Sequence, residues 1–377
     1  MKLADLTTLH VGGDAADVLE PRTPDELLIA VRHTWATGDD WLVLGGGSNV
    51  VISDDGFDGT VLRVLTRGIE SLSHDTAAVR PSAYLGDRTV RLRVQAGEPW
   101  DAVVQHAVEN GWAGIEALSG IPGSSGAAPI QNIGAYGQEL GSSLVAIEFL
   151  DYLSGELLRI PAPELGLGYR TSLLKQGRQG LVVSIELELL AGGEGGPALS
   201  APIAYEQLAT TLGVRIGDRV PLDELRSTVL ALRASKGMLL DPNDRDSYSA
   251  GSFFTNPIVS ENFARRLPAA APRWPTSPEE RDVAVPLGET AAAPTTSGEY
   301  HVKLSAAWLI ERAGISRGFA LPGSRAAVSS RHTLALVNTG GATADEVVQL
   351  ARFVQTRVFA EFGVRLQPEP ILIGLSL

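Results

Sequence analysis

The stretch SGIPGSSGAAPIQNIGAYGQE, residues 119–139, is the most informative part of this sequence. Its glycines carry no side chain, so the backbone can lie directly against a ligand. The same stretch contains the apolar residues Ile121, Pro122, Pro129, Ile130 and Ile133. A disordered linker has little use for so many apolar side chains. A surface loop without a ligand is the alternative, but long loops in compact proteins are usually functional or disordered. We therefore interpret residues 119–139 as a cofactor cradle.

A second glycine turn, GGGSN at residues 45–49, follows the apolar run at residues 41–44. Neither turn fits the common phosphate-binding templates. A Walker loop needs a lysine after its glycines, but no lysine occurs between Lys2 and Lys175. Val50 stands where a dinucleotide fingerprint has its third glycine. The sequence therefore disfavours a nucleoside triphosphatase and a Rossmann domain, and leaves two turns whose N–H groups could bind a pyrophosphate.

Composition places the chain among ordinary globular proteins, with 377 residues, 44% of them hydrophobic and 20% charged. This length accommodates two or three domains. The absence of cysteine excludes disulfides and thiolate catalysis, and six scattered histidines lead us to expect no structural metal. The net charge of -13 argues against nucleic acid as a partner. No apolar run is long enough to span a membrane and the N-terminus lacks a signal-peptide pattern, so we expect a cytoplasmic enzyme without membrane insertion.

Local patterns predict alternating helices and strands. Capping boxes at residues 23–26 and 343–346 mark two helix starts, and glycines at positions 38 and 363 mark the corresponding ends. We expect helices at residues 24–38, 100–109, 222–235, 303–313 and 343–362. We expect strands at residues 41–44, 60–65, 90–96, 144–150, 181–190 and 333–337.

Two stretches of altered composition separate or interrupt these elements. Residues 191–202, AGGEGGPALSAP, are rich in Gly, Ala and Pro and predict a domain boundary or a mobile loop. The stretch from position 268 to position 298 contains six prolines and few apolar residues. We expect it to be an insertion that is ordered at its ends and mobile in its middle.

Three residues in short motifs could carry chemistry. Arg170 in GYRTS offers a fork of donors at a turn, although an isolated arginine is more often a surface residue. Ser252 in AGSFFTNP has a hydroxyl beside two anchoring phenylalanines, although most serines next to glycine only form turns. Glu369 in LQPEP lies between two prolines beside an apolar strand, where a carboxyl could have a raised pKa or could simply be solvated.

Together the motifs are more specific than any one of them. The order GGGSN, SGIPGSSGAAPIQNIGAYGQE, GYRTS, AGSFFTNP, KLSAAWLIERAG and LQPEP closely resembles the UDP-N-acetylenolpyruvoylglucosamine reductases, which are flavoenzymes of bacterial peptidoglycan synthesis. The resemblance covers the chain apart from the insertion. It implies an α+β protein with the vanillyl-alcohol-oxidase-type FAD-binding fold, in which two α+β domains hold FAD and a third α+β domain binds substrate. The implied segments are residues 1–70 (a βαβ subdomain), 71–192, 203–365 (with the 268–298 insertion), and 366–377 as a strand returning toward the flavin.

The resemblance also assigns site residues. It implies that Arg170, Ser252 and Glu369 are catalytic, with Ser252 as the proton donor. The FAD-binding positions would be Gly45, Gly46, Gly47, Ser48, Asn49, Ser119, Ile121, Pro122, Gly123, Ser124, Gly134 and Tyr136. The substrate-binding positions would be Tyr205, Arg233, Lys236, Asn256 and Lys303, with Tyr205 on a loop that folds onto substrate. Thr255 departs from the family pattern, which often has lysine there.

The implied reaction is the NADPH-dependent reduction of UDP-N-acetylglucosamine enolpyruvate to UDP-N-acetylmuramate through non-covalently bound FAD. This would place the chain in cell wall biogenesis, and so in the maintenance of cell shape and cell division. We expect a monomer whose partners are the enolpyruvyl sugar and NADPH. Two alternatives are another FAD-dependent sugar or alcohol oxidoreductase of the same fold and a non-catalytic nucleotide-sugar binding protein.

Overall fold

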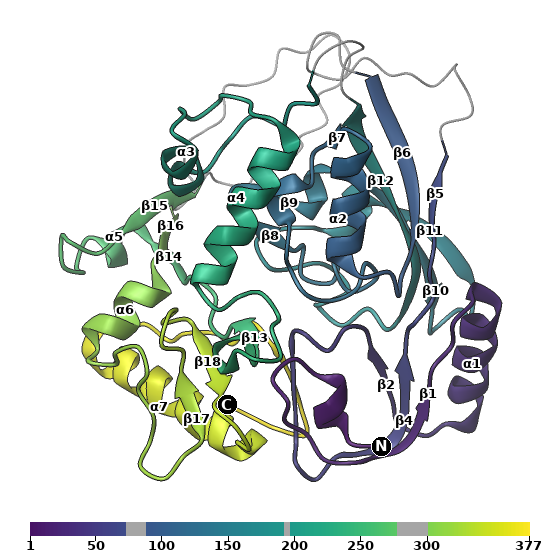
Figure 1. Ribbon diagram of the computed structural model, residues 1–377. Coiled ribbons are helices and arrows are strands. Elements are labelled where there is room, and N and C mark those ends of the chain that lie inside the picture. Colours follow the sequence, from purple (N-terminus) through teal and green to yellow (C-terminus); the bar gives the residue numbers. More distant parts are fainter. Residues whose placement is uncertain (73–87, 192–196, 277–300) are drawn as a thin grey trace, which may run out of the picture.

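The computed structural model describes residues 1–72, 88–191, 197–276 and 301–377, which form three units (Figure 1). The N-terminal unit is a parallel sheet in the order β1–β4–β2, with one helix, α1, between its first two strands in sequence. These elements are β1 (Ala15–Leu19), α1 (Pro24–Thr37), β2 (Trp41–Leu44) and β4 (Phe57–Arg63). Both hydrogen bonds of the predicted capping box form at Thr23, and Gly38 ends α1 in the left-handed conformation.

The middle unit is a larger antiparallel sheet in the order β11–β10–β12–β6–β5, with the short β7 also paired to β12. Its elements are β5 (Ile69–Ser71), β6 (Arg88–Gln95), α2 (Trp100–Glu109), β7 (Trp112–Ala113), β8 (Gly134–Ala135), β9 (Gln138–Glu139), β10 (Leu144–Asp151), β11 (Leu157–Pro161) and β12 (Gly180–Ala191). The apolar face of α2 packs on this sheet to form one core. A further core joins α1 and β4 to β12, so the first two units are packed directly together.

The C-terminal unit contains two antiparallel sheets, β13–β18–β17 and β14–β16–β15. Its elements are α3 (Glu206–Leu212), α4 (Leu222–Ser235), β13 (Ser249–Ser252), β14 (Ile258–Ser260), α5 (Glu261–Ala264), β15 (Arg273–Thr276), β16 (His301–Leu304), α6 (Ala306–Arg312), β17 (Ala326–Val328), β18 (Ala335–Asn338) and α7 (Ala344–Phe362). Short 3-10 helices occur at Leu3–Leu6, Glu116–Leu118, Leu140–Ser142, Ala162–Leu165 and Arg245–Ser247. A large core surrounds α7 and α6.

One predicted helix start is wrong. Lys303 was expected inside a helix, but it lies in β16, paired with Ile258 and Trp274 of the two flanking strands. The helix α6 begins only after Ser305, whose side chain accepts a hydrogen bond from the Trp308 backbone N–H. The start of the predicted insertion forms β15, while its part from 277 to 298 lies outside the described residues, as do residues 192–196 of the predicted boundary.

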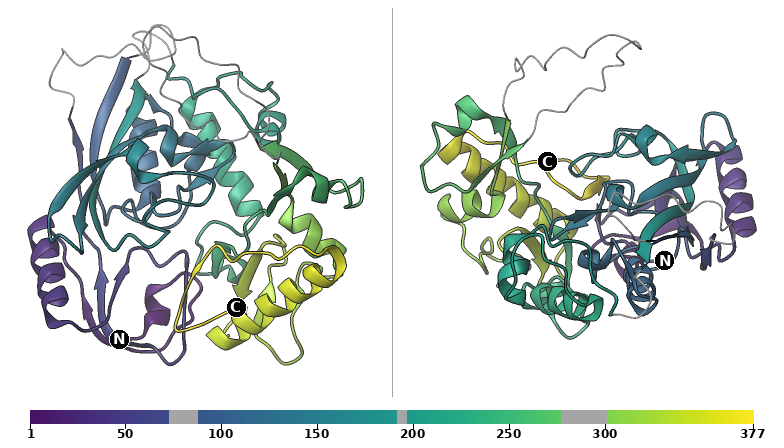
Figure 2. Two further views of the ribbon diagram at one scale, coloured as in Figure 1. Left: turned by 180° about the vertical axis from the view of Figure 1, so that it is seen from behind. Right: turned by 90° about the horizontal axis from the view of Figure 1, so that it is seen from above.

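The C-terminal residues return to the N-terminal unit. The strand β19 (Ile371–Ile373) pairs in parallel with β3 (Val50–Ile52), directly after the GGGSN turn. Figure 2 shows this last segment, in yellow, crossing to the N-terminal part of the chain. Leu9 and Val11 in turn contribute to the core of the C-terminal unit. Across the described ranges, we find no helix with the length and apolar character that a membrane span requires.

Candidate active site

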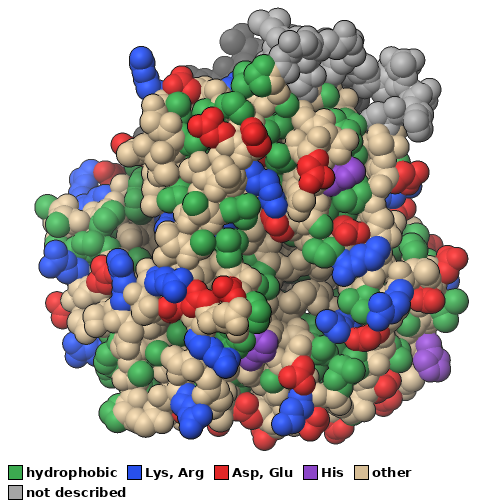
Figure 3. All heavy atoms as spheres, in the orientation of Figure 1, with side chains coloured by type: hydrophobic (Ala, Val, Ile, Leu, Met, Phe, Trp, Pro, Cys, Tyr) green, Lys and Arg blue, Asp and Glu red, His purple; other side chains and the backbone are tan. Residues whose placement is uncertain are grey.

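A cavity of about 600 Å³ lies where the three units meet. Both glycine turns, the Arg170 loop, β12, β13 and the C-terminal segment line this cavity. Its volume falls within the range of roughly 300–1,000 Å³ that is usual for ligand sites. On the face shown in Figure 3, Lys and Arg side chains are interspersed with Asp and Glu rather than gathered in one basic patch.

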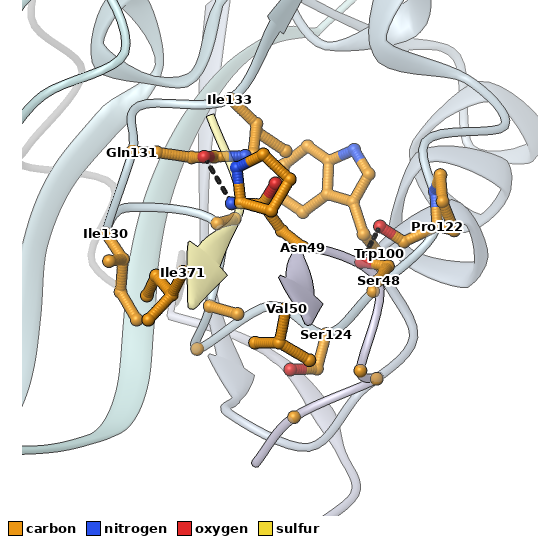
Figure 4. A pocket seen from close by; sticks show the side chains of 18 of the residues that line it. Ser48, Asn49, Val50, Trp100, Pro122, Ser124, Ile130, Gln131, Ile133 and Ile371 are labelled. Atoms are coloured by element: carbon orange, nitrogen blue, oxygen red, sulfur yellow. Dashed lines mark hydrogen bonds between the residues drawn. The ribbon is translucent and has the colours of Figure 1, made fainter. Parts of the chain in front are cut away.

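The two glycine turns touch each other across one side of the cavity. Ser48 Oγ donates to the Pro122 carbonyl oxygen at 3.0 Å, and Asn49 Nδ2 donates to Gln131 Oε1 at 2.6 Å (Figure 4). A Cβ atom on Gly46 would lie 2.7 Å from Gly123 Cα, which is closer than real Cβ atoms approach. The contact between the turns therefore requires glycine. Glycine also leaves the backbone of the turns exposed to a bound cofactor.

Most of the predicted FAD-binding residues line this cavity: Gly45, Gly46, Gly47, Ser48, Asn49, Ile121, Pro122, Gly123, Ser124 and Gly134. Ser119 and Tyr136 are not among its lining residues. Ser119 is fully buried and donates through its hydroxyl to the Glu116 carbonyl oxygen at 2.6 Å. The backbone groups and small side chains along the wall fit an extended cofactor with a pyrophosphate, because the glycines clear the backbone for close approach.

Arg170 and Glu369 meet in the cavity as an ion pair. Arg170 Nε lies 3.2 Å from Glu369 Oε1, and the two side chains are only 19% and 13% exposed. Arg170 has a φ of 56°, a left-handed conformation that costs a non-glycine residue about 1–3 kcal/mol. Its guanidinium also donates to the Gly134 carbonyl oxygen at 2.6 Å. The strained backbone and this second hydrogen bond fix the guanidinium beside the carboxyl group.

Burial raises the pKa of the Glu369 carboxyl, against the effect of the Arg170 guanidinium and the Lys175 ammonium, which lower it. Desolvation thus favours the protonated carboxyl, while the two cations favour the carboxylate. A group balanced in this way can accept or donate a hydrogen bond at a developing charge.

Ser252 lines the same cavity at the end of β13. Its Oγ lies 3.5 Å from Nε2 of His332, a residue just before β18. Burial and nearby cations, Lys236 first among them, lower the pKa of His332 to about 4. The imidazole is therefore neutral near pH 7.

Three of the predicted substrate-binding residues, Tyr205, Lys236 and Lys303, lie in two groups in which a cation is next to an aromatic ring. In the first, the Tyr136 and Tyr205 rings lie 5.8 Å apart edge to face, and Lys236 Nζ lies 5.4 Å from the centre of the Tyr136 ring. In the second, Lys303 Nζ lies 4.9 Å from the centre of the Tyr169 ring.

The other two predicted substrate-binding residues have clear structural contacts. Asn256 accepts a hydrogen bond from the Ala306 backbone N–H at 2.9 Å, at the start of α6. Arg233 lines the cavity but is only 6% exposed. Its guanidinium donates to the Gly120 and Met238 carbonyl oxygens at 3.1 and 3.0 Å.

Two residues of the site had no role in the sequence-based prediction. Lys175 lines the cavity with its ammonium near Glu369. Its position five residues after Arg170, as the first lysine after a long lysine-free stretch, is the only signal the sequence offers. His332 reaches Ser252 from 80 positions along the chain, and no local pattern marks it.

Comparisons with known proteins identify the family of this chain. Residues 241–373 match the model of the UDP-N-acetylenolpyruvoylglucosamine reductase C-terminal domain, and residues 15–161 match an FAD-binding domain. A curated UDP-N-acetylenolpyruvoylglucosamine reductase of Leifsonia xyli subsp. xyli is 60% identical over 100% of this chain and 98% of its own length. The chain belongs to the UDP-N-acetylenolpyruvoylglucosamine reductase family.

Further relatives agree with this assignment. The reductase of Saccharopolyspora erythraea is 46% identical over 100% of this chain and 95% of its own length. The crystal structure of the reductase from Thermus caldophilus, which is 24% identical, has the same fold, with a TM-score of 0.59 over 99% of this chain and 97% of that one. The predicted fold class is thereby confirmed, and the chain is an FAD-containing oxidoreductase of peptidoglycan precursor synthesis.

Proposed function

We propose that this cavity carries out the NADPH-dependent reduction of UDP-N-acetylglucosamine enolpyruvate to UDP-N-acetylmuramate, with Arg170, Ser252 and Glu369 as its catalytic residues. The observation that supports these roles is the convergence of the three side chains, from distant parts of the chain, on one cavity walled by the two glycine turns. Bound FAD would supply the hydride for C3 of the enolpyruvyl group, with NADPH as the source of that hydride.

The FAD pyrophosphate would lie against the backbone of the turns at residues 45–49 and 121–124. This part of the wall offers backbone N–H groups with little side chain to obstruct them. Gly46 and Gly123 approach so closely that an added Cβ atom on Gly46 would lie 2.7 Å from Gly123 Cα, so the two turns together form this wall. The chain thereby holds the cofactor between the N-terminal and middle units.

Arg170 and Glu369 would stabilise the negative charge that develops on the substrate carboxylate when C3 is reduced. Arg170 Nε and Glu369 Oε1 are already 3.2 Å apart, so the pair is assembled before substrate arrives. A preorganised donor of this kind can be worth about 3–4 kcal/mol in a site that excludes water. Burial raises the pKa of Glu369, which allows the carboxyl to offer a proton in a hydrogen bond.

Ser252 would deliver a proton to C2 of the substrate. A serine hydroxyl is a weak acid, and it has a titratable neighbour in His332, whose Nε2 lies 3.5 Å from Ser252 Oγ. The proton acceptor is a strongly basic enolate carbon, which matches a weak acid.

The nucleotide-sugar part would be bound by the two groups of cations and aromatic rings. Tyr205 and Lys236 form one contact surface with Tyr136, and Lys303 and Asn256 form the other beside Tyr169. Arg233 would have a structural role in this region, because its guanidinium already donates hydrogen bonds to two backbone carbonyl oxygens.

We infer that the protein acts as a monomer in the cytoplasm, and that residues 1–70, 71–192, 203–365 and 366–377 are its functional segments, with 268–298 an insertion in the third.

NADPH oxidation by the purified flavoprotein, measured with and without the enolpyruvyl sugar, tests the proposed reaction. We expect oxidation to accelerate with the sugar and one UDP-N-acetylmuramate to form per NADPH consumed, as followed by mass spectrometry. Loss of product formation in Arg170→Ala and Glu369→Gln, with FAD content retained, would support the catalytic roles. A rate that is independent of the enolpyruvyl sugar, or oxidation of a simple alcohol or sugar instead, would refute the proposal.

A further inference from the structure

Lys175 is a cavity residue whose ammonium lies partly buried beside the Glu369 main chain. Its Nζ donates to the Glu369 carbonyl oxygen at 3.3 Å. Its own backbone N–H donates to Ser172 Oγ, which anchors the loop that also carries Arg170. Burial lowers the pKa of Lys175, and Glu369 opposes that effect. Burying the Lys175 ammonium removes part of its hydration, which costs free energy unless new interactions compensate for it.

The peptide of Glu369 is held on both sides. Its N–H donates to the Phe253 carbonyl oxygen at 2.9 Å, next to Ser252. Its carbonyl oxygen accepts from Lys175 and also from Asn49 Nδ2, at 3.4 Å. Prolines on either side limit the backbone further. The backbone of Glu369 is therefore held by hydrogen bonds to the C-terminal unit and to the wall of the cofactor cavity. Lys175 donates one of these bonds.

The same ammonium is one of two cations beside the carboxyl group. Arg170 and Lys175 both lower the pKa of Glu369, whereas burial raises it, and the carboxyl in turn interacts with the Tyr169 phenol. A positive charge near a carboxyl group favours its ionised form and so lowers its pKa. Removing Lys175 would leave Arg170 alone to balance the desolvation.

We propose that Lys175 is a positioning residue for Glu369: it ties the Glu369 main chain to the cavity wall and places a second positive charge beside its carboxyl group. This inference rests on the catalytic role proposed for Glu369. Because Lys175 contacts Glu369, its loss changes how Glu369 titrates as well as how fast the enzyme works.

The experiment follows the protonated carboxyl of Glu369 directly by infrared difference spectroscopy of the FAD-loaded protein across pH, with Glu369→Gln identifying its band. We expect the midpoint to rise by about one pH unit in Lys175→Met, because a neighbouring cation is lost. Lys175→Arg should keep the midpoint near that of the wild type. Lys175→Gln retains a donor for the carbonyl oxygen but no charge, and should shift the midpoint like Met while keeping more of the rate.

Lys236→Met is the matched control, because Lys236 belongs to the group of residues around Tyr136. It should change the KM for the sugar and leave the Glu369 midpoint in place. In the same variants, the pH profile of flavin reoxidation by the sugar should move in step with the infrared midpoint.

An unchanged midpoint in folded, FAD-loaded Lys175→Met or Lys175→Gln would overturn the inference. If the Met variant does not fold, the Gln variant decides alone by the same measurement. The infrared midpoint does not depend on the reaction, so a failure of the proposed catalytic role of Glu369 would appear separately, as full activity in Glu369→Gln.

Discussion

Ser252 Oγ and His332 Nε2 lie 3.5 Å apart, and of the two only Ser252 is among the residues that line the cavity. Ser252 thus faces the cavity, and His332 lies next to it without lining the cavity. Because burial and the neighbouring cations lower the pKa of His332 to about 4, its imidazole is uncharged near neutral pH. His332 therefore adds no positive charge beside Ser252 near neutral pH.

Ser252→Ala should damage the second half-reaction selectively. Reduction of FAD by NADPH needs no proton at C2 of the sugar, whereas product formation does, so we expect a loss of roughly 10²–10⁴-fold in product formation alone. Anaerobic stopped-flow measurement of each half-reaction, with product quantified, checks this. Ser227→Ala, on the exposed face of α4, is the control and should match the wild type. Product formation at the wild-type rate in Ser252→Ala would rule Ser252 out as the proton donor.

The buried imidazole of His332 should make the protein less stable in mild acid. Its folded-state pKa of about 4 lies below the usual value of 6.5, so the unfolded chain binds a proton first as the pH falls. This contribution is complete above pH 6.5 and is lost as the pH falls toward 4, up to about 3 kcal/mol. Urea unfolding at several pH values should show a shallower loss in His332→Asn.

His33→Asn serves as the matched control for this measurement, because His33 is exposed on α1. It should follow the wild-type pH dependence of unfolding. Identical slopes in His332→Asn and the wild type between pH 6.5 and 4 would contradict the assigned environment of His332.

Tyr205 should act on the sugar and not on FAD reduction. Its side chain is 44% exposed and packs edge to face on Tyr136, so it can move onto a bound ligand at little cost. We expect Tyr205→Ala to raise the KM for the enolpyruvyl sugar while the rate of FAD reduction by NADPH stays at the wild-type value. Tyr205→Phe separates the ring from the hydroxyl. A KM that stays unchanged in both variants would remove Tyr205 from the substrate site.

FAD should be held without a covalent bond. The chain has no cysteine, and no histidine occurs among the described residues that line the cavity. Acid precipitation of the purified protein should therefore release all of the flavin into the supernatant, as measured by its absorbance. Yellow colour that remains in the washed pellet would show that a covalent link exists.

Elements defined by local interactions could be predicted from the sequence. Thr23 and Thr343 start their helices where the capping boxes place them, because these hydrogen bonds involve residues only three positions apart. The misplaced start near Lys303 has a non-local cause: β16 exists because β14 and β15 pair with it on both sides. The residues around Lys303 do not indicate by themselves that two strands will pair with them, because a short apolar run is compatible with a helix or a strand.

The candidate site shows the same division. The resemblance of short motifs identified Arg170, Ser252 and Glu369, and the structure brings all three to one cavity. Lys175 and His332 could not be predicted from local sequence. Lys175 contacts Glu369 and His332 contacts Ser252, and only folding brings these distant residues together. Arg233 shows a further limit, since its motif does not reveal how deeply its guanidinium is buried.

The pairing of β19 with β3 also has a consequence for biosynthesis. Residues 371–373 leave the ribosome long after residues 50–52, beside which they add a strand. The N-terminal part of a nascent chain can begin to fold before synthesis ends, but the strand that carries Glu369 to the cavity has not yet emerged. A polypeptide cut short just before position 367 would lack this carboxylate while retaining most of its cores. On the role proposed for Glu369, a product that stops short of this strand would form most of its cores and still lack activity.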